Sequence, residues 1–118
     1  MARSRVEPFS GRAPRAGDEV GLRVDGDLDI VAAPALRQAL HELIDVQGHL
    51  SVTLDVADVS FLDSTGVSVL LGGIRRIRER GGEMTLANPS RSTLRVLEVA
   101  GLSGMFTITR DRDQVDGI

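Results

Sequence analysis

Two stretches in the middle of the chain differ in the period of their hydrophobic residues. From residue 51, Val52, Leu54 and Val56 alternate with other side chains, which predicts a β-strand with one buried face. From residue 67, apolar residues instead recur at intervals of three and four, which predicts an amphipathic helix. Residues 63–66, at the join, read Asp-Ser-Thr-Gly. Polar groups are therefore expected where a strand turns into a helix.

The same patterns predict elements on either side of this unit. Strands are predicted over 20–24, ending in a turn at Gly26, and over 84–87 and 105–109. Helices are predicted from Pro34 to about residue 46 and over 94–100, each followed by a glycine. Because strands and helices alternate, the fold class is expected to be α/β, with parallel neighbouring strands.

Composition limits the possible chemistry. The 118 residues suffice for one domain, and they include no cysteine and only two histidines, His41 and His49. We therefore expect no disulfide, no metal and no cofactor, with both histidines exposed. No run of about 18 apolar residues and no signal-peptide pattern is present, so a cytoplasmic protein without membrane contact is expected.

Charge is divided unevenly along the chain. Residues 1–17 carry a net charge of +3 and residues 18–118 a net charge of −6, which gives the total of −3. A basic arm can bind nucleic acid. However, four arginines interrupted by Pro and Gly would neutralise few phosphates, and the remaining chain is acidic. No direct DNA binding is predicted.

The join at residues 63–66 carries the candidate chemistry. Asp63, Ser64 and Thr65 can each cap the helix, because their oxygens accept from the free amides of its first turn. A helix N-terminus also favours an anion, so a phosphate on Ser64 could be held there. An ordinary cap and turn remains the alternative interpretation.

Ser64 is not expected to be a catalytic nucleophile. It lacks the Gly-x-Ser-x-Gly setting of hydrolases, and no histidine can be assigned as its base. The chain also has no lysine, which excludes a P-loop. We therefore predict that the protein is not an enzyme and has no catalytic residue.

Small residues follow Ser64 on the outer face of the predicted helix, at Ser68 and Gly72. This strip would suit close approach of a partner. Gly72 and Gly73 should each cost about 1 kcal/mol relative to alanine, so a partner contact or close internal packing must offset them. The arginines at 75, 76, 78 and 80 are interpreted as a solvated helix end.

Two carboxylates, Asp27 and Asp29, flank Leu28 after the first strand. They are compatible with a cation site or with a turn in which aspartate bonds its own backbone.

The segment Phe61-Leu62-Asp63-Ser64-Thr65-Gly66-Val67 resembles the signature of the anti-sigma factor antagonists of the STAS family. Further similarity lies in Gly26–Asp29, Ala33–Leu36, Gly81–Asn88 and Val99–Leu102. The resemblance implies a STAS-like single domain over 18–110, with a mixed, mostly parallel sheet of four to five strands and three to four helices. The charge pattern sets residues 1–17 apart as a basic arm, and the resemblance implies a short edge strand there, at residues 6–9. Residues 111–118 are a short polar tail and depart from the family, many members of which carry another helix at this place.

The resemblance also implies a function. The chain would bind an anti-sigma factor serine kinase, free the sigma factor and be switched off by phosphorylation of Ser64, with Thr65 the lesser candidate; a serine phosphatase would reverse this. The expected partner surface comprises Asp29, Asp63, Ser64, Thr65, Gly66, Ser68 and Gly72. A monomer or weak dimer is expected. The alternative is a scaffold or regulatory subunit of a sensory or transport assembly, without a phospho-switch.

Overall fold

The computed structural model describes residues 5–9 and 19–110. Five strands are present: β1 (Arg5–Phe9), β2 (Glu19–Leu28), β3 (Ser51–Leu62), β4 (Glu83–Ala87) and β5 (Thr107–Thr109). The helices are α1 (Ala33–Leu40), α2 (Ser64–Glu79) and α3 (Arg91–Val99). A π-helical segment, η1 (His41–Val46), continues α1, and a 3-10 turn, η2 (Ser103–Met105), precedes β5.

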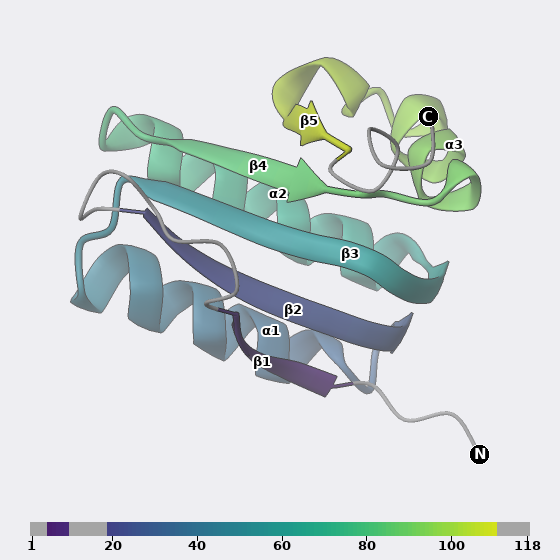
Figure 1. Ribbon diagram of the computed structural model, residues 1–118, viewed down its shortest axis with the longest axis horizontal. Helices are drawn as coiled ribbons and strands as arrows, with labels where there is room; N and C mark the ends of the chain where they lie inside the picture. The colour runs from purple at the N-terminus through teal and green to yellow at the C-terminus, as the bar shows by residue number, and fades with distance from the viewer. Residues whose placement is uncertain (1–4, 10–18, 111–118) are drawn as a thin grey trace, which may run out of the picture.

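The strands form one sheet in the order β1-β2-β3-β4-β5 (Figure 1). β1 pairs with β2 in the antiparallel direction, and the other three pairs are parallel. The predicted α/β class with a mixed, mostly parallel sheet is confirmed. β1 lies at one edge of the sheet, and its Pro8 pairs with Leu22 at an outermost position where the missing N–H is tolerated.

The main core lies between the sheet and the helices α1 and α2, which run side by side in Figure 1. Val52 and Leu54 of β3, Leu40 of α1 and Ile74 of α2 are fully buried. Gly73 lies at the closest approach, because an added Cβ would be 3.0 Å from Leu40 Cδ1 and 3.1 Å from Met84 Cε. Internal packing therefore explains this glycine.

The end of β2 and the start of β5 differ from the sequence prediction. β2 does not end at Gly26 but continues to Leu28, because its pairing with β3 resumes after register irregularities on both sides of Asp25–Gly26. Gly26 has a positive φ of 85° and acts as a strand irregularity rather than a terminal turn. β5 begins only at Thr107, because Met105 closes the η2 turn and Phe106 is buried in the core.

Most of the predicted N-terminal arm and the predicted C-terminal tail lie outside the described residues. Within the described part of the chain, no helix is both long and apolar enough to span a membrane.

Candidate functional site

The candidate site lies where the parallel strands β2 and β3 end. Carboxyl ends of neighbouring parallel strands share one edge of a sheet, so the turn before α1 and the start of α2 lie next to each other. A backbone hydrogen bond joins them directly, with the Asp63 N–H donating to the Leu28 carbonyl oxygen at 3.3 Å. The acidic turn and the hydroxyl motif predicted from the sequence therefore share one edge of the domain.

Asp63 is the cap of α2. Its Oδ1 accepts from the backbone amides of Thr65 at 2.9 Å and Gly66 at 3.0 Å. Its backbone is extended, as an N-cap requires. The sequence left three capping candidates, and the structure selects the carboxylate. Two of the free amides at the helix start are consequently occupied by a negative group.

Ser64 is the first residue of α2 and is exposed. Because Asp63 provides the cap, the Ser64 hydroxyl is not needed for it. Thr65, by comparison, is partly buried. Of the two hydroxyls in the motif, that of Ser64 is therefore the more accessible to a modifying enzyme.

Gly66 is buried against the end of β2. An added Cβ would lie 2.5 Å from the Leu28 carbonyl oxygen and 2.8 Å from Leu62 Cδ1. No side chain fits in that space, so glycine allows the first turn of α2 to rest on β2. The structure thus gives Gly66 a positioning role beneath the predicted partner surface.

Asp29 organises the turn that leads into α1. Its Oδ1 accepts from the amides of Val31 at 3.0 Å and Ala32 at 3.1 Å, and its carbonyl oxygen accepts from Ala33 N at 2.8 Å. These contacts match the turn interpretation of the sequence. Among the described residues, no group of three or more His, Cys, Asp or Glu side chains is placed to hold a metal ion.

The two adjacent glycines of α2 differ in their surroundings, because Gly72 lies on the outer face of the helix and Gly73 lies in the core. Ser68 is exposed, and Gly72 is partly exposed with no atom within 4 Å of the place where its Cβ would be. In contrast to Gly73, Gly72 therefore has no packing reason to be glycine, although glycine inside a helix costs about 1 kcal/mol.

Three apolar residues at the same edge were missed in the sequence. Ile30 and Val31, in the turn before α1, are 69% and 81% exposed, and Phe61, near the end of β3, is 54% exposed. The sequence feature that points to this apolar surface is the pair of adjacent aliphatic residues directly after the predicted Asp29 turn. Periodicity cannot reveal exposure in a turn, because a turn has no regular buried face.

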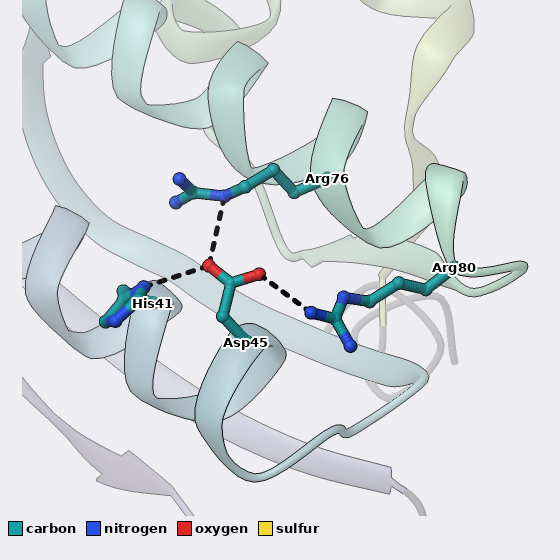
Figure 2. Close-up of polar contacts among 4 residues, drawn as sticks. All are labelled: His41, Asp45, Arg76 and Arg80. Carbon is teal, nitrogen blue, oxygen red and sulfur yellow. Dashed lines mark hydrogen bonds and ion pairs between the residues drawn. The ribbon is translucent and has the colours of Figure 1, made fainter.

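A separate polar cluster joins η1 to the C-terminal end of α2 (Figure 2). Asp45 Oδ2 lies 2.9 Å from His41 Nδ1 and 3.4 Å from Arg76 Nε, and Asp45 Oδ1 lies 3.4 Å from Arg80 Nη2. The His41 hydrogen bond, followed by the charges of Arg76 and Arg80, holds the pKa of Asp45 below its ordinary value despite some desolvation. The Arg76 and Arg80 side chains remain 40% and 45% exposed, in line with the predicted solvated helix end, but both also pair with Asp45, which the sequence did not indicate.

The remaining arginines of this helix end differ in their contacts. Arg78 is exposed and donates from Nη2 to the Met105 carbonyl oxygen at 3.2 Å, which links α2 to η2. This helix end is therefore tied to two neighbouring segments of the fold.

The two histidines differ in exposure. His41 is exposed, as the sequence predicted, while His49 is partly buried and contacts Gln47 Oε1 at 3.0 Å.

Comparison with known proteins identifies the family. The sequence model of the STAS domain matches residues 12–115. The chain belongs to the STAS domain family. The anti-sigma-B factor antagonist of Listeria monocytogenes is 31% identical to this STAS domain over 103 residues, which cover 87% of this chain and 90% of that protein.

Solved structures with a similar fold include two forms of SpoIIAA. The anti-sigma factor antagonist SpoIIAA in its unphosphorylated form is 28% identical, with a TM-score of 0.71 and 98% coverage of both chains. The Bacillus cell fate determinant SpoIIAA in the phosphorylated form is 23% identical, with a TM-score of 0.68 and the same coverage. The resemblance stated from the Asp63–Gly66 motif and the predicted STAS-like fold are both confirmed.

Proposed function

We propose that this STAS domain is an anti-sigma factor antagonist switched off by phosphorylation of Ser64. In the unphosphorylated form it binds an anti-sigma factor serine kinase and frees the sigma factor. The observation that carries the proposal is the exposed Ser64 hydroxyl at the first turn of α2, which Asp63 leaves free by serving as the cap. The similarity to the Listeria antagonist supports the functional class.

The proposed partner surface follows the end of β2 and the outer face of α2. Ser64, Thr65 and Ser68 provide its hydroxyl groups, and Gly72 allows the partner backbone to approach closely. Asp29 and Asp63 fix the two turns through their bonds to backbone amides. Gly66 lies beneath this surface and keeps the two turns together.

Phosphorylation would act through charge at the contact. In the kinase, the Ser64 oxygen attacks the γ-phosphorus of ATP, the bond to the ADP oxygen breaks, and the serine proton is released. The phosphate adds about −1.5 to −2 charges. The amides of Thr65 and Gly66 already bond Asp63 Oδ1, so the new anion stands beside a carboxylate instead of an open helix terminus.

Such a charge is costly to remove from water when a partner covers it. We therefore expect the partner complex to dissociate while the domain stays folded. The match to the phosphorylated form of SpoIIAA supports this expectation, because it indicates that the same fold can carry a phosphate. A serine phosphatase would restore the hydroxyl and the binding-competent form.

The direct test is intact-mass measurement after incubation with ATP, Mg²⁺ and the ATP-binding anti-sigma factor of the same organism. Wild type and Thr65→Ala should each gain one phosphate, about 80 Da, whereas Ser64→Ala should gain none. Thr65→Ala is the matched control, because it removes the neighbouring hydroxyl of the same motif. A phosphate that persists in Ser64→Ala would overturn the assignment of the switch residue.

A further inference from the structure

The exposed apolar residues that the sequence did not indicate lie on the two segments that meet at the start of α2. Ile30 and Val31 occupy the turn that follows β2, and Phe61 precedes Ser64 by three residues on β3. Single exposed hydrophobic residues are ordinary, but several of them on adjoining segments mark contact surfaces. Ile30, Val31 and Phe61 are here called the apolar edge residues.

The segments that carry these residues are held in place before any partner arrives. The Asp63 N–H to Leu28 carbonyl bond ties the end of β3 to the end of β2. Asp29 Oδ1 bonds the amide of Val31 and so fixes the turn. A preorganised surface loses little conformational entropy on binding, so its apolar area contributes more fully to affinity.

The two chain segments that carry the apolar edge residues bear charge of one sign, while the basic Arg5 lies opposite Asp25 on the neighbouring strand β1. Residues 24–36 and 51–74 contain no Arg, Lys or His. Six carboxylates lie in these two segments, on Asp25, Asp27, Asp29, Asp55, Asp58 and Asp63. Asp55 is buried and does not contribute to the surface. Asp58 is exposed on β3, close in sequence to Phe61. A complementary partner surface would be apolar at its centre and bordered by basic side chains.

We propose that the apolar edge residues anchor the kinase partner, whose matching surface is an apolar recess bordered by Arg or Lys. This inference rests on the proposed function and specifies the chemistry of the partner at the same site. Burial of Phe61 and the two aliphatic side chains supplies affinity. Asp58 attracts the basic border during approach. A phosphate on Ser64, next in sequence to Asp63, keeps this edge hydrated and prevents that burial.

The test compares two edge variants with two matched controls elsewhere on the surface. Phe61→Ser and Asp58→Asn alter the edge, whereas Val99→Ser and Glu98→Gln alter α3, where Val99 is 84% exposed and Glu98 is exposed. Each protein is used in its unphosphorylated form, and surface plasmon resonance measures the rates at which it associates with and dissociates from the kinase partner. Circular dichroism verifies that each variant is folded.

Phe61→Ser should raise Kd about tenfold or more, chiefly through faster dissociation. Asp58→Asn should slow association a few-fold and weaken its dependence on salt. Both α3 controls should bind within about twofold of wild type, as expected for residues outside the contact. The double variant Ile30→Ser/Val31→Ser, which leaves Phe61 in place, should also dissociate faster than wild type.

Two contrary results are distinguishable. If Phe61→Ser and the Ile30/Val31 double variant bind as tightly as Val99→Ser, while wild type binds and is phosphorylated at Ser64, the apolar anchor is refuted and the proposed function stands. If wild type neither binds nor is phosphorylated by a kinase that phosphorylates another substrate, both proposals are refuted.

Discussion

Gly66 lies directly against the carbonyl group of Leu28, with only 2.5 Å between that oxygen and the place where a Cβ of residue 66 would be. The same oxygen accepts the hydrogen bond from Asp63 N. The end of β2 is therefore fixed to the first turn of α2. This contact sets the position of Ser64 relative to the Asp29 turn, and the proposed partner surface depends on it.

Substitution of Gly66 tests this contact. Gly66→Ala should destabilise the domain by about 1–3 kcal/mol, because the methyl group overlaps a backbone oxygen that cannot rotate away. Chemical denaturation gives the free energy of unfolding, and partner binding should weaken in the same variant. Gly104→Ala is a useful control, since no atom lies within 4 Å of its Cβ position. Equal stability of Gly66→Ala and wild type would contradict the packing described here.

Gly72 and Gly73 should respond in opposite ways to alanine. Gly72→Ala should stabilise the domain by about 0.5–1 kcal/mol, because the site is open and alanine is the better helix former. The same variant should bind the kinase partner more weakly, since its methyl group separates the surfaces. Thermal unfolding and isothermal titration calorimetry together measure both effects. Unchanged partner affinity would remove Gly72 from the proposed surface.

Gly73→Ala provides the comparison. Its methyl group would meet Leu40 and Met84 at about the closest distances that side chains tolerate. We expect a loss of stability of up to about 1–3 kcal/mol in this variant, measured in the same unfolding experiment. A stabilised Gly73→Ala would show that α1 and α2 pack less closely than the structure indicates.

The capping effect of Asp63 and the effect of its charge can be measured separately with two substitutions. Asp63→Ala should cost about 1 kcal/mol of stability, since the amides of Thr65 and Gly66 lose their acceptor. Asp63→Asn keeps an acceptor oxygen and should retain most of that stability. Phosphorylation of Ser64 should weaken partner binding less in Asp63→Asn than in wild type, because the adjacent negative charge is removed. An identical effect of phosphate in both proteins would exclude repulsion by Asp63.

The Asp45 cluster should make stability depend on pH. Its pKa is lowered in the folded state by His41, Arg76 and Arg80. A carboxyl with a depressed folded pKa stabilises the protein above its unfolded pKa, about 3.9, and loses that contribution as pH falls through the folded value. The free energy of unfolding of wild type should therefore decrease below about pH 4 more steeply than that of Asp45→Asn.

The matched variant for this comparison is Glu98→Gln, which removes an exposed carboxylate on α3. The free energy of unfolding of Glu98→Gln should decrease with falling pH as that of wild type does. High salt should reduce the difference in free energy of unfolding between wild type and Asp45→Asn, because the ion pairs of Asp45 with Arg76 and Arg80 are partly exposed and therefore screened. Parallel pH profiles for wild type and Asp45→Asn at low salt would contradict a depressed pKa.

The strand-to-helix unit was predictable because its signals are local. The change from strand alternation through Val56 to helical spacing from residue 67, with the polar residues at 63–65, was sufficient to place a helix start and its capping candidates. The choice of Asp63 over Ser64 was not predictable, because all three residues can accept from the same amides. That choice depends on backbone geometry, which residue types do not specify.

Long-range contacts account for the features that the sequence did not predict. Gly26 favours a turn locally, yet pairing with β3 keeps it inside a strand. Asp45 meets Arg76 and Arg80 only because η1 packs beside α2. Likewise, helical spacing places Gly72 on the outer face of α2, but the close contact of Gly73 with Leu40 and Met84 depends on residues far away in the sequence or on another element. Each of these features depends on residues about 30 or more positions away or on packing between elements. Such contacts leave no pattern in the local sequence.

The central claim is that a phosphate on Ser64 abolishes binding without unfolding the domain. The most direct measurement is the Kd of the kinase partner for the unphosphorylated protein and for the protein phosphorylated at Ser64, with circular dichroism of both. We predict an increase in Kd of about a hundredfold or more for the phosphorylated form, since a charge left uncompensated at a contact is costly, and unchanged circular dichroism spectra. Equal affinity of the two forms, or loss of the folded spectrum on phosphorylation, would contradict the account.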